Sequence, residues 1–296
     1  TVNVLTPVSF TVPESIELTL MTPGQGAITD ISTDEFDPSL ITFEGQGDYA
    51  DISLDEKNNI IVVGKKLGDG EFQVNYNGEQ MGVTSFNVGA EIKLESGWNW
   101  MSNYTASSIA LKQAGSTDYI TEYFTGSNMI KEARSQTDLL YNDTEKYGAF
   151  GTIEEFNPNT MYKVNMAGPR SFYPKSTELT SSVVRIVTKG YTWINYPIVG
   201  NHSMEYFNNQ AKLEGFNGCV IMGKDGFAEY NNGKWVASGN FKMETGKGYI
   251  FYMPEAGTLT LNFGESYVDE GPPANAKALS SIANVWKYVT SQFAHN

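Results

Sequence analysis

Hydrophobic and polar residues alternate with a period of two through most of the first 90 residues. Alternation of this kind predicts β-strands that bury one face. The predicted strands cover residues 8–12, 16–20, 52–54, 60–63 and 72–76. Asn77-Gly78 has the composition of a tight hairpin turn and joins the last of them to a strand at 81–83. About seven short strands spaced in this way predict an immunoglobulin-like β-sandwich.

The rest of the chain contains an internal repeat. The block GWNWMSNY at 97–104 reappears as GYTWINYP at 190–197, and KYGAFGTI at 146–153 matches KWVASGNF at 234–241. Each copy closes with a turn and a strand that contains tyrosine. Two separate blocks in the same order predict that two related β modules follow the sandwich.

These patterns predict an all-β chain with three folded parts. The sandwich occupies residues 1–90, the first module (module 1) residues 91–180 and the second module (module 2) residues 181–271. Residues 272–296 follow two prolines and are rich in Ala and Ser. We interpret this last segment as a linker or the start of a further domain, although its apolar spacing also suits an amphipathic helix.

Both parts of the chain resemble known families. Residues 60–70, which read IIVVGKKLGDG, resemble bacterial Ig-like domains, with a Gly-Asp-Gly turn at the end. The repeats resemble the Gly-Trp-Asn-Trp-(Ile/Met)-Ser modules of Bacteroides-type surface proteins, although residues 220–224 depart from that pattern in the second copy. The resemblance implies an exported, extracellular or cell-surface protein of modular build, longer than this chain and associated with adhesion or glycans. It implies no reaction.

Charge excludes two classes of partner. The chain carries 20 Lys and Arg against 34 Asp and Glu, a net charge of −14. A field of this sign repels nucleic-acid backbones and anionic lipid surfaces. The single cysteine, Cys219, permits no internal disulfide, and the longest apolar runs are too short to span a bilayer. We therefore expect no nucleic-acid partner and no transmembrane segment.

Sequence motifs for catalysis are missing. The chain has two histidines and no metalloprotease, nucleophile-elbow or phosphate-loop pattern. Glu154 and Glu155 are neighbours on a predicted strand and would face opposite sides, which excludes a glycosidase carboxylate pair. Two acidic clusters, near residues 30–37 and 48–56, lack EF-hand spacing, so we interpret them as a solvated rim and not as a calcium loop. The sequence predicts no enzyme, no cofactor and no metal.

Tryptophans on the opening strands of the repeats alternate with polar residues, at positions 98, 100 and 193. We expect them to fill the core of each module. Tyr230 and Trp235 flank an Asn232-Gly233 turn, so their rings should share one face of a hairpin. In the first copy we assign the corresponding places to Tyr141 and Tyr147.

Two interpretations of these four residues stay open. The rings can brace their hairpins, which is the preferred interpretation, or they can form a platform on which a sugar ring stacks. Tyr141, Tyr147, Tyr230 and Trp235 are therefore the candidate ligand-binding residues. The sequence as a whole predicts a non-catalytic structural or adhesion segment that contacts a host or glycan surface. The alternative is a glycan-binding module of a polysaccharide-utilisation system.

Overall fold

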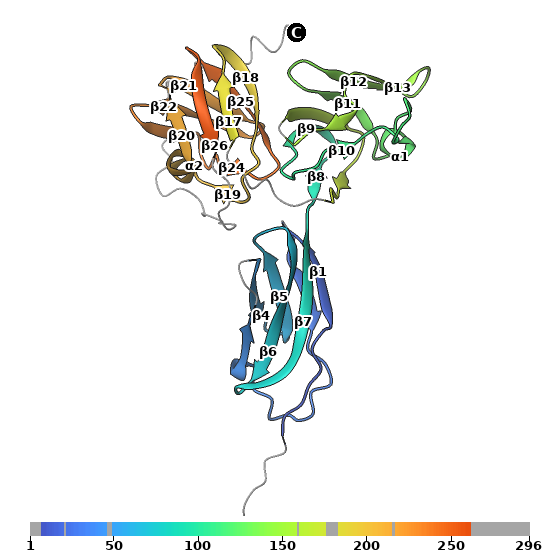
Figure 1. Cartoon of the computed structure of the whole chain (residues 1–296), viewed down its shortest axis with the longest axis vertical. Helices are drawn as coiled ribbons and strands as arrows, with labels where there is room; N and C mark the ends of the chain where they lie inside the picture. The colour runs from blue at the N-terminus through green and yellow to red at the C-terminus, as the bar shows by residue number, and fades with distance from the viewer. Residues whose placement is uncertain are drawn as a thin grey trace, which may run out of the picture.

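The computed structural model describes residues 7–20, 22–45, 49–158, 160–175, 183–214 and 217–261. These residues form β-strands joined by turns and a few short helices, so the predicted all-β class is confirmed. In Figure 1 the N-terminal sandwich extends away from the two modules, which lie beside each other at the opposite end. The predicted linker or helix at 272–296 lies outside the described residues.

The N-terminal part is a sandwich of two sheets. The larger sheet has the order β1 (Ser15–Thr19), β7 (Glu79–Gly89), β6 (Gly68–Tyr76) and β3 (Ile41–Glu44). The smaller sheet has the order β2 (Gly24–Ala27), β5 (Asn59–Gly64) and β4 (Ala50–Leu54). Alternate residues on these strands, such as Ile60, Val62, Phe72 and Val74, are almost fully buried between the sheets.

Several details of the sandwich differ from the sequence prediction. Residues 8–12 form no strand, and only Thr11 makes an isolated bridge, to Thr29. The predicted turn at 68–70 lies inside β6. Strand β2 escaped prediction because its glycines break the alternation, and Gly24 is required there since a Cβ would lie 2.7 Å from Ile16 Cγ2. The predicted hairpin turn is confirmed, with positive φ at Asn77 and Gly78.

Each module is built on a five-stranded antiparallel sheet, and the two sheets have the same strand order. In module 1 the order is β13 (Gly148–Gly151), β12 (Leu139–Asp143), β11 (Ile130–Arg134), β15 (Met161–Met166) and β9 (Gly97–Ser102). In module 2 the order is β23 (Lys234–Ala237), β22 (Gly226–Asn231), β21 (Cys219–Gly223), β25 (Gly248–Met253) and β18 (Gly190–Asn195).

The smaller elements follow the same plan in both modules. Module 1 pairs β10 (Ile109–Ala110) with β14 (Glu155–Phe156) and β8 (Ile92–Leu94) with β16 (Arg170–Phe172). Module 2 pairs β19 (Asn201–His202) with β24 (Met243–Glu244) and places β26 (Gly257–Leu261) between β17 (Val183–Val187) and β20 (Ala211–Glu214). Among the described residues, each module has one short helix, α1 (Thr121–Phe124) or α2 (Met204–Gln210). Within the described residues, no helix has the length and apolar character needed to cross a membrane.

A buried tyrosine occupies the same place in each module. The hydroxyl of Tyr162 accepts the backbone N–H of Asn157 at 3.0 Å and donates to the carbonyl of Glu155 at 3.2 Å. The hydroxyl of Tyr249 accepts the N–H of Glu244 at 2.7 Å and donates to the carbonyl of Lys242 at 3.2 Å. In both modules the partners lie five and seven residues before the tyrosine, so the copies share a hydrogen-bonded framework as well as a strand order.

A short, hydrogen-bonded connection joins the sandwich to module 1. Only Ala90 and Glu91 separate β7 from β8, and the Glu91 carboxylate accepts hydrogen bonds from Thr19, Ser171 and Tyr173. One continuous cluster of buried side chains runs through the sandwich and module 1, whereas module 2 has a core of its own. A third, smaller cluster lies where the two modules meet.

Candidate binding site

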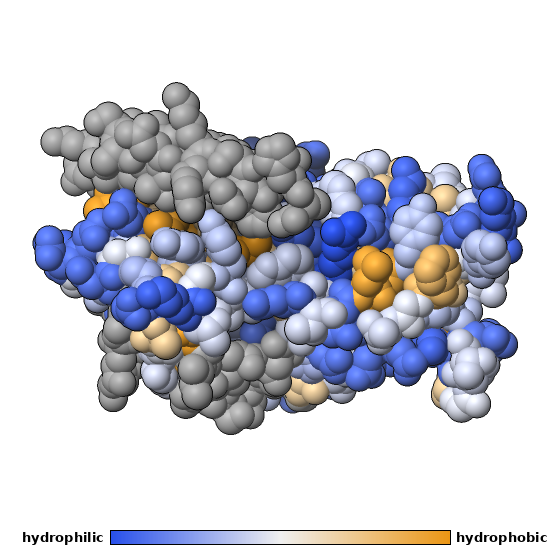
Figure 2. All heavy atoms as spheres, turned by 90° about the horizontal axis from the view of Figure 1, so that it is seen from above, coloured by the Kyte–Doolittle hydropathy of each residue, from blue (hydrophilic) through white to orange (hydrophobic). Residues whose placement is uncertain are grey.

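Exposed hydrophobic side chains gather on one face of the module 1 sheet. Side chains alternate between the two faces of a strand, so Leu140 of β12 is buried in the core while Leu139 and Tyr141 point outward. We call this outward side the outer face. Its exposed residues form the aromatic platform, which consists of Trp98, Leu139, Tyr141, Tyr147 and Phe150, each 40–76% exposed. Figure 2 shows hydrophobic side chains among hydrophilic ones at the surface of the right-hand half, where module 1 lies.

Rings of the platform contact one another. Tyr141 on β12 lies directly opposite Phe150 on β13, and their ring centroids are 5.7 Å apart. Tyr147, on the turn between these strands, meets the same Phe150 ring edge to face at 6.5 Å. Phe150 therefore joins the two tyrosines predicted as candidates. Sequence reasoning missed it, because this pairing depends on the length of the turn between β12 and β13, which the sequence does not specify.

Tyr230 and Trp235 lie elsewhere. They face each other across β22 and β23, as predicted, with ring centroids 4.9 Å apart. Both are half-buried. However, they lie on the side of the sheet that faces the core of module 2, where the Trp235 ring is 6.0 Å from Phe207 of α2. This geometry favours bracing over ligand binding for the pair.

The predicted equivalence between the two tyrosine pairs is wrong. Leu140 and Ala228 occupy matching positions, since each lies opposite a buried residue of the next strand. Counting from them, the residues that match Tyr230 and Trp235 are Asn142 and Ala149. The turn between β12 and β13 is longer than the Asn232-Gly233 turn. Aligning the two sequences by residue identity therefore matches Trp235 with Tyr147, two residues before its structural counterpart Ala149.

The tryptophans of the opening strands do not fill the module cores, contrary to expectation. Trp98 is 40% exposed on the platform, and Trp100 and Trp193 lie half-buried where the two modules meet. The core side of β9 is taken by Asn99, whose amide bonds to the backbone of Glu95, together with a fully buried methionine. Alternation showed correctly that the tryptophans of one strand share a face, but it assigned them the wrong one.

A lysine lies between the two equivalent tryptophans. Lys163 Nζ is 4.4 Å from the ring centre of Trp100 and 4.7 Å from that of Trp193. Both distances suit cation–π attraction. Burial, and secondarily the charge of Arg134, lowers the pKa of Lys163 to about 8. Arg134 in turn lies over the Trp98 ring and forms an ion pair with Glu132, so charged groups separate the platform from the contact between modules.

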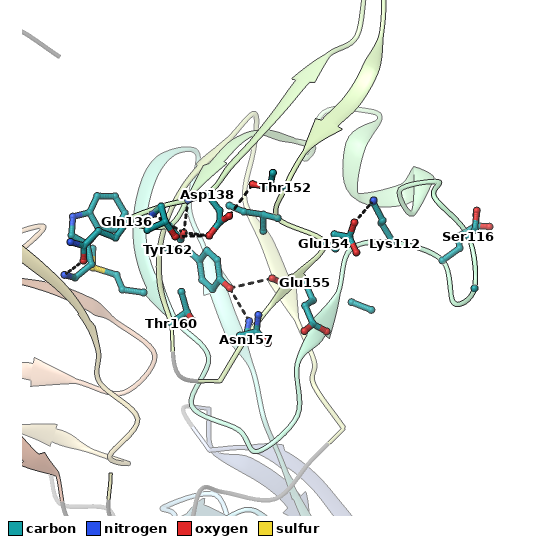
Figure 3. Close-up of a pocket in the computed structure, with 18 residues that line it drawn as sticks. Lys112, Ser116, Gln136, Asp138, Thr152, Glu154, Glu155, Asn157, Thr160 and Tyr162 are labelled. Carbon is teal, nitrogen blue, oxygen red and sulfur yellow. Dashed lines mark hydrogen bonds and ion pairs between the residues drawn. The ribbon is translucent and has the colours of Figure 1, made fainter. Parts of the chain in front are cut away.

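A polar groove of about 770 Å³ opens at the end of the outer face, beside the 135–138 turn. Figure 3 shows Asp138 held by hydroxyl groups of its neighbours. The donors are Thr137, Thr152 and Ser135, and they lower the pKa of the Asp138 carboxyl. A carboxylate held in this way stays ionised and keeps the turn in shape. The same turn presents Gln136, whose amide bonds to the backbone of Tyr191 and Trp193 in module 2.

Glu154 and Glu155 both line this groove, and their carboxylates point in different directions. Lys112 binds the Glu154 carboxylate at 2.6 Å, and Figure 3 shows the Glu155 carboxylate directed elsewhere. The backbone carbonyls of both residues also accept hydrogen bonds, that of Glu154 from the N–H of Leu111 and that of Glu155 from the hydroxyl of Tyr162. In the described part of the chain, no group of three or more His, Cys, Asp or Glu residues is arranged to hold a metal ion.

Comparison with known proteins adds no assignment. No protein-family model matches the chain, and no curated protein matches it either. The candidate site therefore rests on the geometry of module 1.

Proposed function

We propose that this chain is a non-catalytic adhesion segment of an exported, cell-surface protein and that the aromatic platform of module 1 binds carbohydrate. The observation that carries the proposal is the platform itself. Five large hydrophobic side chains are exposed along one sheet face and its β12–β13 turn, and three of the four rings belong to one contact cluster. Aromatic faces present flat apolar surface at little cost in conformational entropy, which suits stacking against the C–H face of a sugar.

Polar side chains beside the rings support the same function. Glu132, Arg134 and Asn165 lie on the central strands of the outer face, between Tyr141 on one side and Trp98 on the other. Sugar hydroxyl groups require donors and acceptors close to the stacking rings. Carboxylate, guanidinium and amide groups supply both.

The connections between the parts support a structural role alongside binding. Module 2 is fixed to module 1 by hydrogen bonds from Ser102 to the backbone of Gly246 and Lys247, at 2.8 Å each. The sandwich is fixed by the Glu91 hydrogen bonds described above. A chain joined in this way holds the platform in a defined position relative to the sandwich.

The test is binding of the full chain to a broad panel of plant, bacterial and host polysaccharides, by array or affinity gel electrophoresis. We expect retention on at least one polysaccharide. Tyr141→Ala should weaken it by about 1–3 kcal/mol, on the scale of ring stacking measured for nucleic-acid bases. The matched control is Tyr49→Ala in the sandwich, a tyrosine of similar exposure (42% against 45%). It should leave retention unchanged.

Trp235→Ala separates the two groups of candidate residues. Because Trp235 faces the core of module 2, its removal should lower stability and leave retention intact. If no polysaccharide of the panel is retained, or if Tyr141→Ala and Tyr49→Ala bind equally well, carbohydrate binding by the platform is wrong.

A further inference from the structure

One row of side chains crosses the whole outer face of module 1. The row, which we call the transverse row, consists of Phe150, Tyr141, Glu132, Asn165 and Trp98, each directly opposite the next on neighbouring strands. Strands of a sheet lie about 4.8 Å apart, so the backbone of Trp98 is about 14 Å from that of Tyr141 and about 19 Å from that of Phe150. Rings thus stand at both ends of a row that is much longer than one sugar ring.

The middle of the row is polar. Glu132 and Asn165 lie between the two ring positions, and Arg134 stands beside them, over the Trp98 ring and paired with Glu132. A ligand that reaches both ends must therefore place apolar faces over the rings and hydrogen-bonding groups over the middle. A chain of sugar units does this, because each unit has an apolar face and a rim of hydroxyl groups.

Building on the proposed carbohydrate function, we infer that the transverse row binds a linear, extended β-1,4-linked oligosaccharide that runs across the strands from Trp98 to Phe150. An extended chain lies along a row of this kind, whereas a helical α-linked glucan curves away from it. The two ends act as separate stacking subsites, and the polar middle binds the hydroxyl groups of the units between them.

The outer face of module 2 shows what the same sheet looks like when it binds protein. There the middle of the face is apolar, with Val220, Met222 and Ile250 buried against module 1. Protein interfaces have an apolar centre and a polar rim. The transverse row has the reverse order, with a polar centre and apolar ends, which favours a glycan over a protein partner.

The experiment is isothermal titration of the full chain with cello-, xylo-, manno- and chito-oligosaccharides of increasing length. We expect at least one series to bind, with affinity rising as the chain lengthens and levelling off once it spans the row. Trp98→Ala and Phe150→Ala remove opposite ends, so each should cost the long oligosaccharides on the order of tenfold in affinity. Each variant should flatten the dependence on length. Tyr49→Ala, the control, should keep the full dependence.

Several results would overturn the inference. If a single sugar binds as tightly as the long oligosaccharides, or if the polysaccharide retained in the broad panel is α-linked and all four series fail, the extended-chain inference is wrong while the proposed function stands. If nothing in the broad panel binds, both are wrong. Concentration-dependent dimerisation that Tyr141→Ala abolishes, without glycan binding, would make this face a protein interface instead. Circular dichroism and thermal melting confirm that each variant is folded.

Discussion

The two modules share a framework but use the same sheet face in opposite ways. Residues at matching positions can be compared through their strand pairing. In the middle of the face, the matching pairs are Glu132 and Val220, Arg134 and Met222, Lys163 and Ile250, and Asn165 and Tyr252. Module 1 is polar or charged at the first three of these positions, where module 2 is apolar. Toward the hairpin strands the contrast reverses at one position, where Tyr141 of module 1 corresponds to Glu229 of module 2.

This difference shows which part of the repeat is constrained. The buried tyrosine, the strand order and the glycine with positive φ that opens the first strand, Gly97 or Gly190, are the same in both copies. These features set the backbone. The outer face is free to differ, since exchanging its side chains leaves the core and the ladder of hydrogen bonds intact. In module 2 the middle of this face became a contact surface inside the protein, whereas in module 1 the part of the face that carries the platform stayed open to solvent.

The largest effect should come from giving module 2 the residue found in module 1. Ile250 is fully buried between the modules and matches Lys163, which belongs to the same contact region. Ile250→Lys would bury a second ammonium group there, at a cost of about 3 kcal/mol or more in the free energy of unfolding. Denaturant unfolding of the full chain measures this. The control is Ile250→Val, which adds no charge and should cost about 1 kcal/mol. Equal losses in the two variants would contradict a buried contact at this position.

A smaller effect should distinguish the ring pair of module 2 from the platform of module 1. Trp235→Ala removes a half-buried ring that packs on the core and on Phe207, so it should cost about 2 kcal/mol of stability. Tyr147 is 76% exposed, and Tyr147→Ala should change stability by less than about 0.5 kcal/mol. Thermal melting of both variants checks the pair. A larger loss in Tyr147→Ala than in Trp235→Ala would reverse the roles given to the two sites.

The smallest effect concerns the pH dependence of the contact between modules. The pKa of Lys163 is about 8 in the folded protein, below the ordinary lysine value of 10.5. Between these two values the unfolded chain holds more protons than the folded one. The free energy of unfolding should therefore rise as the pH increases from about 8 toward 10.5.

The lysine is half-buried and partly screened by solvent, so this gain should be on the order of 1 kcal/mol. Melting curves of the natural protein and of Lys163→Met across pH 7–10 isolate the contribution, because the variant lacks the titrating group. The prediction would be contradicted if the natural protein lost stability relative to Lys163→Met as the pH rises, because the pKa of the lysine would then be higher in the folded protein than in the unfolded chain.

The sequence predicted much of the framework. Alternation located β1, β4, β5 and β6, and Asn77-Gly78 and Asn232-Gly233 predicted tight turns that the structure confirms by their positive φ values. Sequence reasoning also brought Tyr230 opposite Trp235. It failed where the length of a turn was unknown, so Tyr147 was taken for the partner of Tyr141 when Phe150 holds that place. Register across a longer loop depends on which residues the loop leaves out of the ladder, and composition does not specify this.

Which residues share a face follows from the sequence alone, because side chains on a strand alternate with a period of two. What each face packs against depends on the tertiary structure. Trp98 and Trp100 point the same way from β9, yet one is exposed on the platform and the other is covered by module 2. Burial depends on whether a second sheet lies over a given part of the face, and that is set by contacts between residues far apart in the chain, such as Gln136 with Trp193. No local pattern around Trp98 contains that information.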